Sequence, residues 1–486
     1  MSALHSPQRS GPGTSLVADP SRPRRGRLVR RVLAAAVLGG VMAGGMWALW
    51  PQDRPQRGAP PASGPGARRA AVVTAGVPAT LSDLTAYIGG QEALVRARPG
   101  DARAWAGLGA AYVERGRRTA DAADYPRAEQ ALRASLKARE EGNAEALAAL
   151  AALADARRDF PAARRWGEEA LKLAPKRWTS YPPLIDAYDG LGDYQAVRRT
   201  LEKLTGLRTG AAARPAVMAR TAAVYRDRGW REDATAQLSD AAAAARSPAE
   251  QAAYLAATGQ LAWERGDRED ALRHFDAALR LDPGQSVALT GRARTLAALG
   301  RTTEALTAYR TALARRHGPE DALELGEYYE SMGMERQAQA QYEVLRARVR
   351  EGVAGGVDEE LLIGRFEADH GDPQEAVSRL RAEWERQPGI EVADALGWAL
   401  HRTGEDEEAL RYASVATDRT KGGGVRSALY SFHRGMIERD LELSASARRD
   451  LREALVTNPY FSPLRVPVAQ EALRELGEPP DEPVPE

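Results

Sequence analysis

Histidine offers more acid–base and metal-binding chemistry at neutral pH than any other side chain, and this sequence has six of them. They stand at positions 5, 274, 317, 370, 401 and 433, and no two are close enough in sequence to share a turn of helix. A His-Glu-x-x-His zinc motif is therefore excluded. Because the chain has no cysteine, it can form no thiolate nucleophile, zinc–thiolate centre or disulfide. We predict no metal site.

Other motifs that carry chemistry are missing as well. The sequence has no Gly-x-x-x-x-Gly-Lys-Ser/Thr loop, no Gly-x-Gly-x-x-Gly turn and no Gly-x-Ser-x-Gly elbow. Neighbouring carboxylates such as Glu168-Glu169 and Glu407-Glu408 fall on the expected solvent side of a helix, where they are solvated charges. We therefore predict no catalytic residue and no cofactor, and we expect that the protein is not an enzyme.

A pair of small residues twelve positions apart recurs along most of the chain. The second members of the later pairs follow one another at 33 to 38 residues, which indicates one helix-turn-helix unit stacked many times. In such an array each unit is expected to contact only its neighbours. The pairs are Gly259/Ala271, Ala293/Ala305, Gly326/Ala338, Gly364/Ala376, Gly397/Ala409 and Gly435/Ala447, with Ala151/Ala163, Ile185/Val197 and Ala222/Ala234 upstream.

The unit from 252 to 283 has the clearest pattern. Gly259 and Ala271 are small, which predicts that its two helices cross there. Gly266 is expected to supply a left-handed turn between the helices, and Asp267 to cap the second helix. Phe275 is large and is expected to fill the gap to the neighbouring unit.

These residues resemble the tetratricopeptide repeat, which has Leu-Gly and Tyr in helix A, Ala and Phe in helix B, and a closing Pro. The resemblance implies an all-α, right-handed solenoid of about ten repeats from Ala102 to about Phe461. The sequence departs from the repeat pattern at seven extra residues around Thr119 to Asp124, and an irregular helical bundle is the alternative. The matching positions are Trp105, Leu108-Gly109, Tyr112, Tyr188, Gly192-Asp193-Tyr194, Tyr225, Leu325-Gly326, Tyr329, Leu396-Gly397, Pro175, Pro283, Pro388 and Pro459.

In this family helix A lines a concave groove, so the resemblance implies that the partner binds there. Large aromatic and arginine side chains in such a groove are the types that dominate interface energetics. The alternative is that the tryptophans pack between neighbouring A helices. The groove positions are Arg226, Gln260, Trp263, Arg294, Glu327, Glu330, Arg365, Trp398, His401, Phe432, Met436 and Arg439. The family's clamp for a C-terminal carboxylate needs Asn and Lys, which are not at the corresponding positions here.

The amino-terminal region predicts a membrane anchor. Val32–Trp50 is nineteen residues without a charge, which spans ~28 Å as a helix, close to the hydrocarbon thickness of a bilayer. Six arginines precede it, at 22, 24, 25, 27, 30 and 31, and place that end in the cytoplasm. The repeats would then lie outside the cytoplasm. A cleaved signal peptide, a twin-arginine export signal and a buried soluble helix are the alternatives.

The chain therefore divides into seven expected segments. They are a basic cytoplasmic tail at 1–31, a transmembrane anchor at 32–50, a disordered linker at 51–80, a capping helix at 81–101, the repeat array at 102–461, a second capping helix at 462–477 and an acidic tail at 478–486. The net charge of +1, from 68 basic and 67 acidic residues, argues against nucleic acid as a partner.

Together these features predict a membrane-anchored scaffold whose partners are a protein or extended peptide and the lipid bilayer at Val32–Trp50. The first alternative is an accessory subunit of an envelope-biogenesis, secretion or transport complex. The second is a scaffold that faces the cytoplasm.

Overall fold

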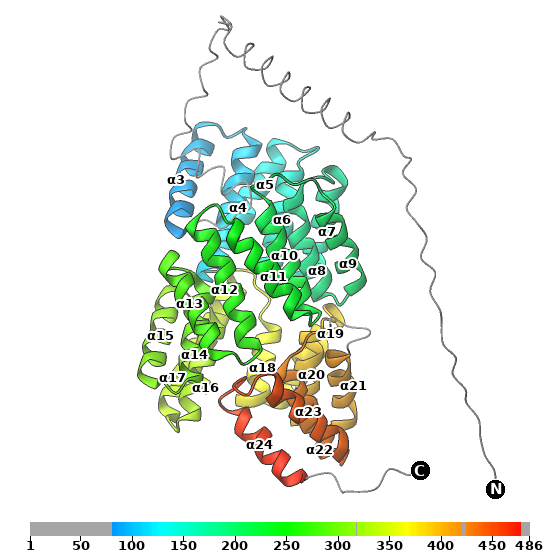
Figure 1. Cartoon of the computed structure of the whole chain (residues 1–486). Helices are drawn as coiled ribbons and strands as arrows, with labels where there is room; N and C mark the ends of the chain where they lie inside the picture. Colours follow the sequence, from blue (N-terminus) through cyan, green and yellow to red (C-terminus); the bar gives the residue numbers. More distant parts are fainter. Residues whose placement is uncertain (1–79, 317, 419–423, 478–486) are drawn as a thin grey trace, which may run out of the picture. The chain divides into compact units, whose positions relative to one another are not determined.

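A computed structural model describes residues 80–316, 318–418 and 424–477, which all belong to the larger of two compact units, Ser63–Glu486. Over these residues the chain forms 22 α-helices and one short 3-10 helix, and it forms no strand. The prediction of an all-α repeat solenoid is confirmed (Figure 1).

Ten consecutive helix pairs fill the chain between a first and a last single helix, within the described ranges. The first single helix is α3 (Leu81–Ala97) and the last is α24 (Arg465–Leu476). The pairs are α4 (Ala102–Thr119) with α5 (Asp124–Ala138), α6 (Ala144–Ala156) with α7 (Phe160–Leu173), α8 (Tyr181–Gly190) with α9 (Tyr194–Thr205), α10 (Arg214–Asp227) with α11 (Arg231–Ala244), α12 (Pro248–Glu264) with α13 (Arg268–Leu281), α14 (Ser286–Ala298) with α15 (Thr302–Arg315), α16 (Pro319–Ser331) with α17 (Glu335–Ala354), α18 (Glu360–His370) with α19 (Pro373–Arg386), α20 (Ile390–Arg402) with α21 (Asp406–Thr417), and α22 (Ala428–Asp440) with α23 (Ser444–Thr457).

Small residues at the predicted crossings let the helices of a pair approach closely. A Cβ atom on Gly259 would lie 2.8 Å from the ring of Phe275, and one on Gly326 would lie 2.3 Å from the ring of Tyr342. Ala271 has no exposed surface. These distances leave no room for a larger side chain, as the twelve-residue spacing predicted.

Phe275 also joins its unit to the next one. The same ring that covers Gly259 lies 2.3 Å from the place where a Cβ atom on Gly291 of α14 would be. Phe275 has no exposed surface, so it is wedged between two glycines of successive A helices. The prediction that this side chain fills the gap to the neighbouring unit is confirmed.

The turn between α12 and α13 is partly as predicted. Gly266 has a φ of 78°, which is the left-handed conformation that favours glycine. Asp267 stands at the cap position of α13, but its side chain makes no capping hydrogen bond. It accepts instead from Arg265 Nε at 3.0 Å, because a nearby guanidinium offers a charge-assisted partner. The predicted Asp267 cap is therefore wrong.

Contacts between distant repeats correct the expectation that each unit touches only its neighbours. Arg118 at the end of α4 pairs with Asp282 after α13 at 2.5 Å. The backbone N–H of Phe160 donates to Gln387 Oε1 at 2.9 Å, and Asn458 Nδ2 donates to the Trp263 carbonyl at 2.8 Å. These residues are 164 to 227 positions apart, so successive turns of the superhelix touch each other.

Nothing in the structure bears on the predicted anchor, because Val32–Trp50 lies outside the described residues, as do most of the linker and the acidic tail. Among the helices that are described, none is both long and apolar enough to cross a membrane.

Candidate functional site

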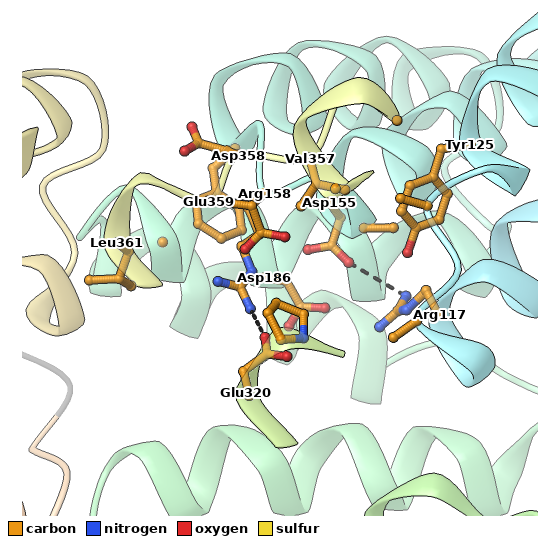
Figure 2. Close-up of a pocket in the computed structure, with 18 of the residues that line it drawn as sticks. Arg117, Tyr125, Asp155, Arg158, Asp186, Glu320, Val357, Asp358, Glu359 and Leu361 are labelled. Atoms are coloured by element: carbon orange, nitrogen blue, oxygen red, sulfur yellow. Dashed lines mark hydrogen bonds and ion pairs between the residues drawn. The ribbon is translucent and has the colours of Figure 1, made fainter. Parts of the chain in front are cut away.

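Contact between superhelical turns forms an open cavity of 1240 Å³, here named the N-terminal cavity (Figure 2). One wall comes from helices α4 to α8 and α10 with the loop at 120–123, and the other from segments at 316–320, 348–361 and 383–392. The loop lies where the sequence placed the extra residues of the first repeat, around Thr119 to Asp124. A Cβ atom on Gly355 would lie 2.5 Å from the Ala122 carbonyl, so the loop and the later turn are in direct contact.

Charged side chains cover much of the N-terminal cavity. Among its described lining residues, eleven carboxylates face six arginines. Five of these arginines are in ion pairs within the lining: Arg117–Asp155 at 3.5 Å, Arg158–Glu320 at 2.7 Å, Arg226–Asp227 at 2.7 Å, Arg316–Glu320 at 4.0 Å, and Arg220–Asp186. The dashed lines in Figure 2 mark the first two of these pairs. The carboxylates that remain give the cavity an acidic character.

Burial and mutual repulsion raise the pKa of several of these carboxyl groups. Desolvation raises the pKa of Asp155, and nearby Asp186 adds to the shift while Arg117 opposes it. The pKa of Asp189 is raised by desolvation and then by Asp227 and Asp186. Burial raises the pKa of Glu359 to about 7. Desolvation and repulsion between neighbouring carboxylates thus both disfavour the charged forms of these groups.

Two further hollows lie along the later repeats. The aromatic pocket, of 470 Å³, is lined by Trp263, Arg294, Tyr309, Glu327 and Tyr328 together with residues of 459–467. The polar pocket, of 500 Å³, is lined by Glu330, Asp369, His370, Trp398, His401, Phe432, Met436 and Arg439 together with residues 464, 465 and 468.

One stretch of the chain, residues 458–468, borders both pockets and is here named the C-terminal segment. Tyr460 lies under the guanidinium of Arg268, with 3.8 Å from Arg268 Cζ to the ring centroid. Arg465 forms an ion pair with Asp369 and lies over the ring of Trp398, 5.3 Å from its centroid. Tyr460 and Arg465 therefore fix this segment against α13, α18 and α20.

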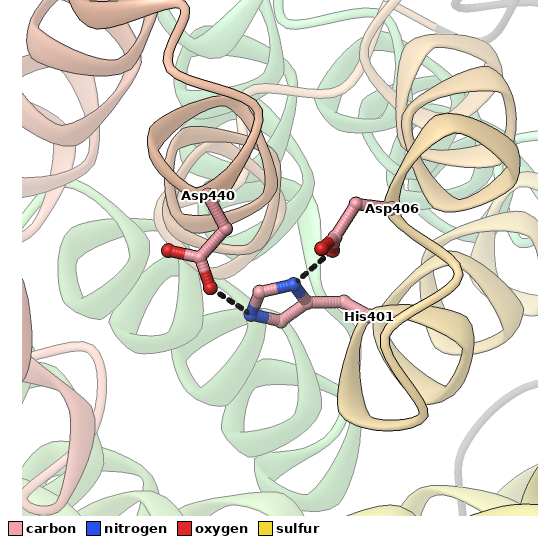
Figure 3. Close-up of side chains that lie close together, drawn as sticks. All are labelled: His401, Asp406 and Asp440. Carbon is pink, nitrogen blue, oxygen red and sulfur yellow. Dashed lines mark hydrogen bonds and ion pairs between the residues drawn. The ribbon is translucent and has the colours of Figure 1, made fainter.

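His401 lies between two aspartates in the polar pocket (Figure 3). Its Nδ1 is 2.6 Å from Asp406 Oδ1, and its Nε2 is 3.9 Å from Asp440 Oδ2. Within the described ranges, this is the one group of three His, Asp or Glu side chains whose possible metal-binding atoms lie within 4.8 Å of one another. Each ring nitrogen faces a different carboxylate: Nδ1 is hydrogen-bonded to Asp406, while Asp440 lies beyond hydrogen-bond distance of Nε2, so the arrangement fits an ion-paired histidine better than three ligands around one ion.

The structure brings ten of the twelve predicted groove residues to the three cavities. Arg226 lines the N-terminal cavity, Trp263, Arg294 and Glu327 line the aromatic pocket, and Glu330, Trp398, His401, Phe432, Met436 and Arg439 line the polar pocket. Gln260 and Arg365 do not line these cavities; they bond to Glu264 Oε1 at 3.0 Å and the Glu391 carbonyl at 3.4 Å.

Not all of these side chains are open to a ligand. Trp263, Trp398, Phe432 and Met436 are buried, with 6%, 6%, 1% and 5% of their surface exposed. Trp398 donates to Asp369 Oδ1 at 2.8 Å and stacks on His433, with ring centroids 4.3 Å apart. Trp398 therefore packs between neighbouring A helices, which was the alternative to an exposed position in the groove. The polar members, such as Arg294 and Glu327, are half-buried.

Reasoning from the sequence missed most of the N-terminal cavity. Of its charged lining, only Arg226 was among the predicted groove residues. The extra residues around 119–124 and the glycines at 352–356 were signals, since both segments line the cavity. The contact between these two segments depends on the pitch of the superhelix, and the residue pattern of one repeat does not determine that pitch.

The helix pairs and the small residues at their crossings define a helical-repeat solenoid, and the pockets described above lie between its helices. Residues 256–322, from within α12 to within α16, match the tetratricopeptide repeat family. These residues therefore carry the tetratricopeptide-repeat pattern, as the sequence indicated. A search of curated proteins finds no match to this chain.

Several solved structures are similar to this chain. Human IFIT1, in a dimer with PPP-AAAA, is 16% identical over 68% of this chain and 77% of that chain, with a TM-score of 0.43. Yeast Tom70 is 13% identical over 76% and 96%, with a TM-score of 0.33. A tetratricopeptide repeat protein from Parabacteroides merdae is 18% identical over 54% and 99%, with a TM-score of 0.31.

Proposed function

We propose that this protein is a non-enzymatic scaffold that binds an extended peptide or a protein segment on the concave face of its later repeats. One observation carries the proposal: the chain's own C-terminal segment already lies against this face and borders both pockets there. Repeat solenoids of this kind generally serve as scaffolds that present surface. The segment indicates which side chains the surface accepts.

The contacts of the C-terminal segment define the chemistry of the expected partner. Tyr460 is held by a cation–π contact with Arg268, and Phe461 lies 5.7 Å from Phe432 between ring centroids. Arg465 provides a positive charge to Asp369. The expected partner is therefore a proline- and aromatic-containing segment with an arginine, which competes with residues 458–468 for the same face.

This proposal is tested by adding the segment as a separate molecule. An eleven-residue peptide with the sequence of residues 458–468 is titrated into the double variant Tyr460→Ala/Arg465→Ala, and binding is followed by fluorescence anisotropy. We expect micromolar binding to the variant and at least about tenfold weaker binding to the unmodified protein. The tethered segment competes at an effective concentration that can reach the millimolar range.

The control is the same peptide with alanine at the positions of Tyr460 and Arg465. It should bind both proteins weakly, because it lacks the cation–π contact and the ion pair. Failure of the unaltered peptide to bind the double variant, or equal binding to both proteins, would contradict a peptide site on this face.

We also propose that the scaffold is anchored in the cytoplasmic membrane by Val32–Trp50 and that its repeats lie outside the cytoplasm. The support is the length of this uncharged stretch and the six arginines before it. A scaffold placed this way suits an accessory subunit of an envelope, secretion or transport complex.

Protease added to intact protoplasts tests this topology. We expect digestion of the repeat array, while an epitope placed before Arg22 stays protected. Lysis before protease treatment is the control, since it should expose the epitope. Protection of the repeats in intact cells would reverse the orientation and make the protein a scaffold that faces the cytoplasm.

A further inference from the structure

Glu359 in the wall of the N-terminal cavity is a buried carboxylate with an unused oxygen. Its side chain is among those that line the cavity, and only 6% of the residue is exposed (Figure 2). Within the described part of the chain, Glu359 Oε2 has no hydrogen-bond partner. Burial raises the pKa of Glu359 to about 7, so above this pH the charged carboxylate is left with an unsatisfied oxygen, at a free-energy cost that a donor from a ligand would relieve.

Other carboxylates of the cavity also lack enough positive charge around them. Asp189 forms no ion pair with any described residue, while Asp227 pairs with Arg226 and Asp186 with Arg220. Burial, and then repulsion from Asp227 and Asp186, raises the pKa of Asp189. Eleven carboxylates and six arginines line the cavity, and Arg386 beside it pairs with Asp358 and Glu383, so the local balance is still acidic. A ligand with positive charges would relieve this repulsion.

The geometry argues for an extended ligand rather than a metal ion. Among the described residues, one group of three side chains brings possible metal-binding atoms within 4.8 Å of one another. It consists of His401, Asp406 and Asp440, which lie outside this cavity. The cavity's 1240 Å³ is also far larger than an ion needs. Apolar residues such as Phe160, Val357 and Ile390 stand among the acids, so the lining suits charged groups joined by methylene spacers.

We propose that the N-terminal cavity binds a linear organic polycation, whose ammonium groups pair with Glu359 and Asp189 while its methylene spacers contact the apolar lining. A free polyamine and the lysine side chains of a partner protein share this chemistry. The site is independent of the C-terminal segment and of the peptide-binding function proposed above.

Isothermal titration calorimetry on the purified full-length protein at pH 8 tests the site with three probes: spermidine, a blocked Ala-Lys repeat hexapeptide and magnesium chloride. We expect saturable binding of spermidine, or of the lysine peptide if a partner protein is the source. Glu359→Gln and Asp189→Asn should each weaken binding by about tenfold, the loss of one charge-assisted hydrogen bond.

Glu343→Gln is the matched control, because Glu343 is 68% exposed in its side chain and lies outside the cavity. It should bind the probes as the unmodified protein does. Helical circular dichroism shows whether each variant is folded, and two variants at separate positions protect the test against one that is not. Binding of neither organic probe, binding of magnesium alone, or equal affinity in all four proteins would overturn the proposal.

Discussion

Replacing Phe275 with alanine is expected to destabilise the middle of the array by about 3–5 kcal/mol, the range for removing a buried aromatic ring from a core. The ring has no exposed surface and fills the space between Gly259 and Gly291. Neither glycine has a side chain that could move into the cavity. The truncation would therefore loosen the crossing of α12 with α13 and the contact of α13 with α14 together.

Hydrogen exchange read by mass spectrometry should show where stability is lost. We expect the greatest loss of protection in α12 to α14, and a smaller loss near Asn458, which bonds to the Trp263 carbonyl. Val456→Ala is the control, because Val456 is 80% exposed and its truncation should change stability by less than about 0.5 kcal/mol. Equal loss of protection from α4 to α23 would indicate a single cooperative core instead of a repeat array.

Glu359→Gln is expected to stabilise the protein above pH 7, by up to about 3 kcal/mol. Burial raises the pKa of Glu359 from 4.5 to about 7; Glu320 and Asp358 add to the shift, and Arg158 opposes it. The folded chain therefore keeps a proton that the unfolded chain releases. The contribution of Glu359 is most favourable below pH 4.5 and is lost as the pH rises to 7. Glutamine carries no charge and avoids this loss.

Thermal unfolding of both proteins at pH 5 and pH 8 measures the effect. The variant and the unmodified protein should unfold at similar temperatures at pH 5, where Glu359 is protonated in the folded state. At pH 8 the variant should unfold at the higher temperature, while Glu343→Gln should match the unmodified protein at both values. A variant that is less stable at pH 8 would show that the charged carboxylate has a partner.

The pattern of small residues was enough to predict the helix pairs. Gly259 and Ala271 predict a close crossing because only a short side chain lets two helices approach, and this rule depends on residues close together in the sequence. Phe275 was predictable for the same reason, since the next unit follows within one repeat length. Local steric requirements thus repeat along the chain and can be read from it.

The contacts between superhelical turns could not be predicted in this way. Arg118 and Asp282 meet because small rotations between successive repeats add up over 164 residues. The total rotation cannot be predicted from the residue pattern of a single repeat. The N-terminal cavity depends on the same contact between superhelical turns. The sequence alone therefore does not indicate that Asp155 and Glu359, which belong to separate repeats, line one cavity. The burial of Trp398, by contrast, comes largely from Asp369 and His433 of neighbouring repeats, and only its contact with Arg465 comes from the end of the chain.

The bonds between successive turns also determine how the array responds to mechanical force. An open solenoid lengthens under tension like a spring, since each repeat can tilt against the next at little cost. Here the pairs Arg118–Asp282 and Arg158–Glu320 and the bond from Asn458 to Trp263 connect one coil to the following one. A pull on the two ends must break these connections before the coils can separate, so the array resists extension as a stiff body and then yields.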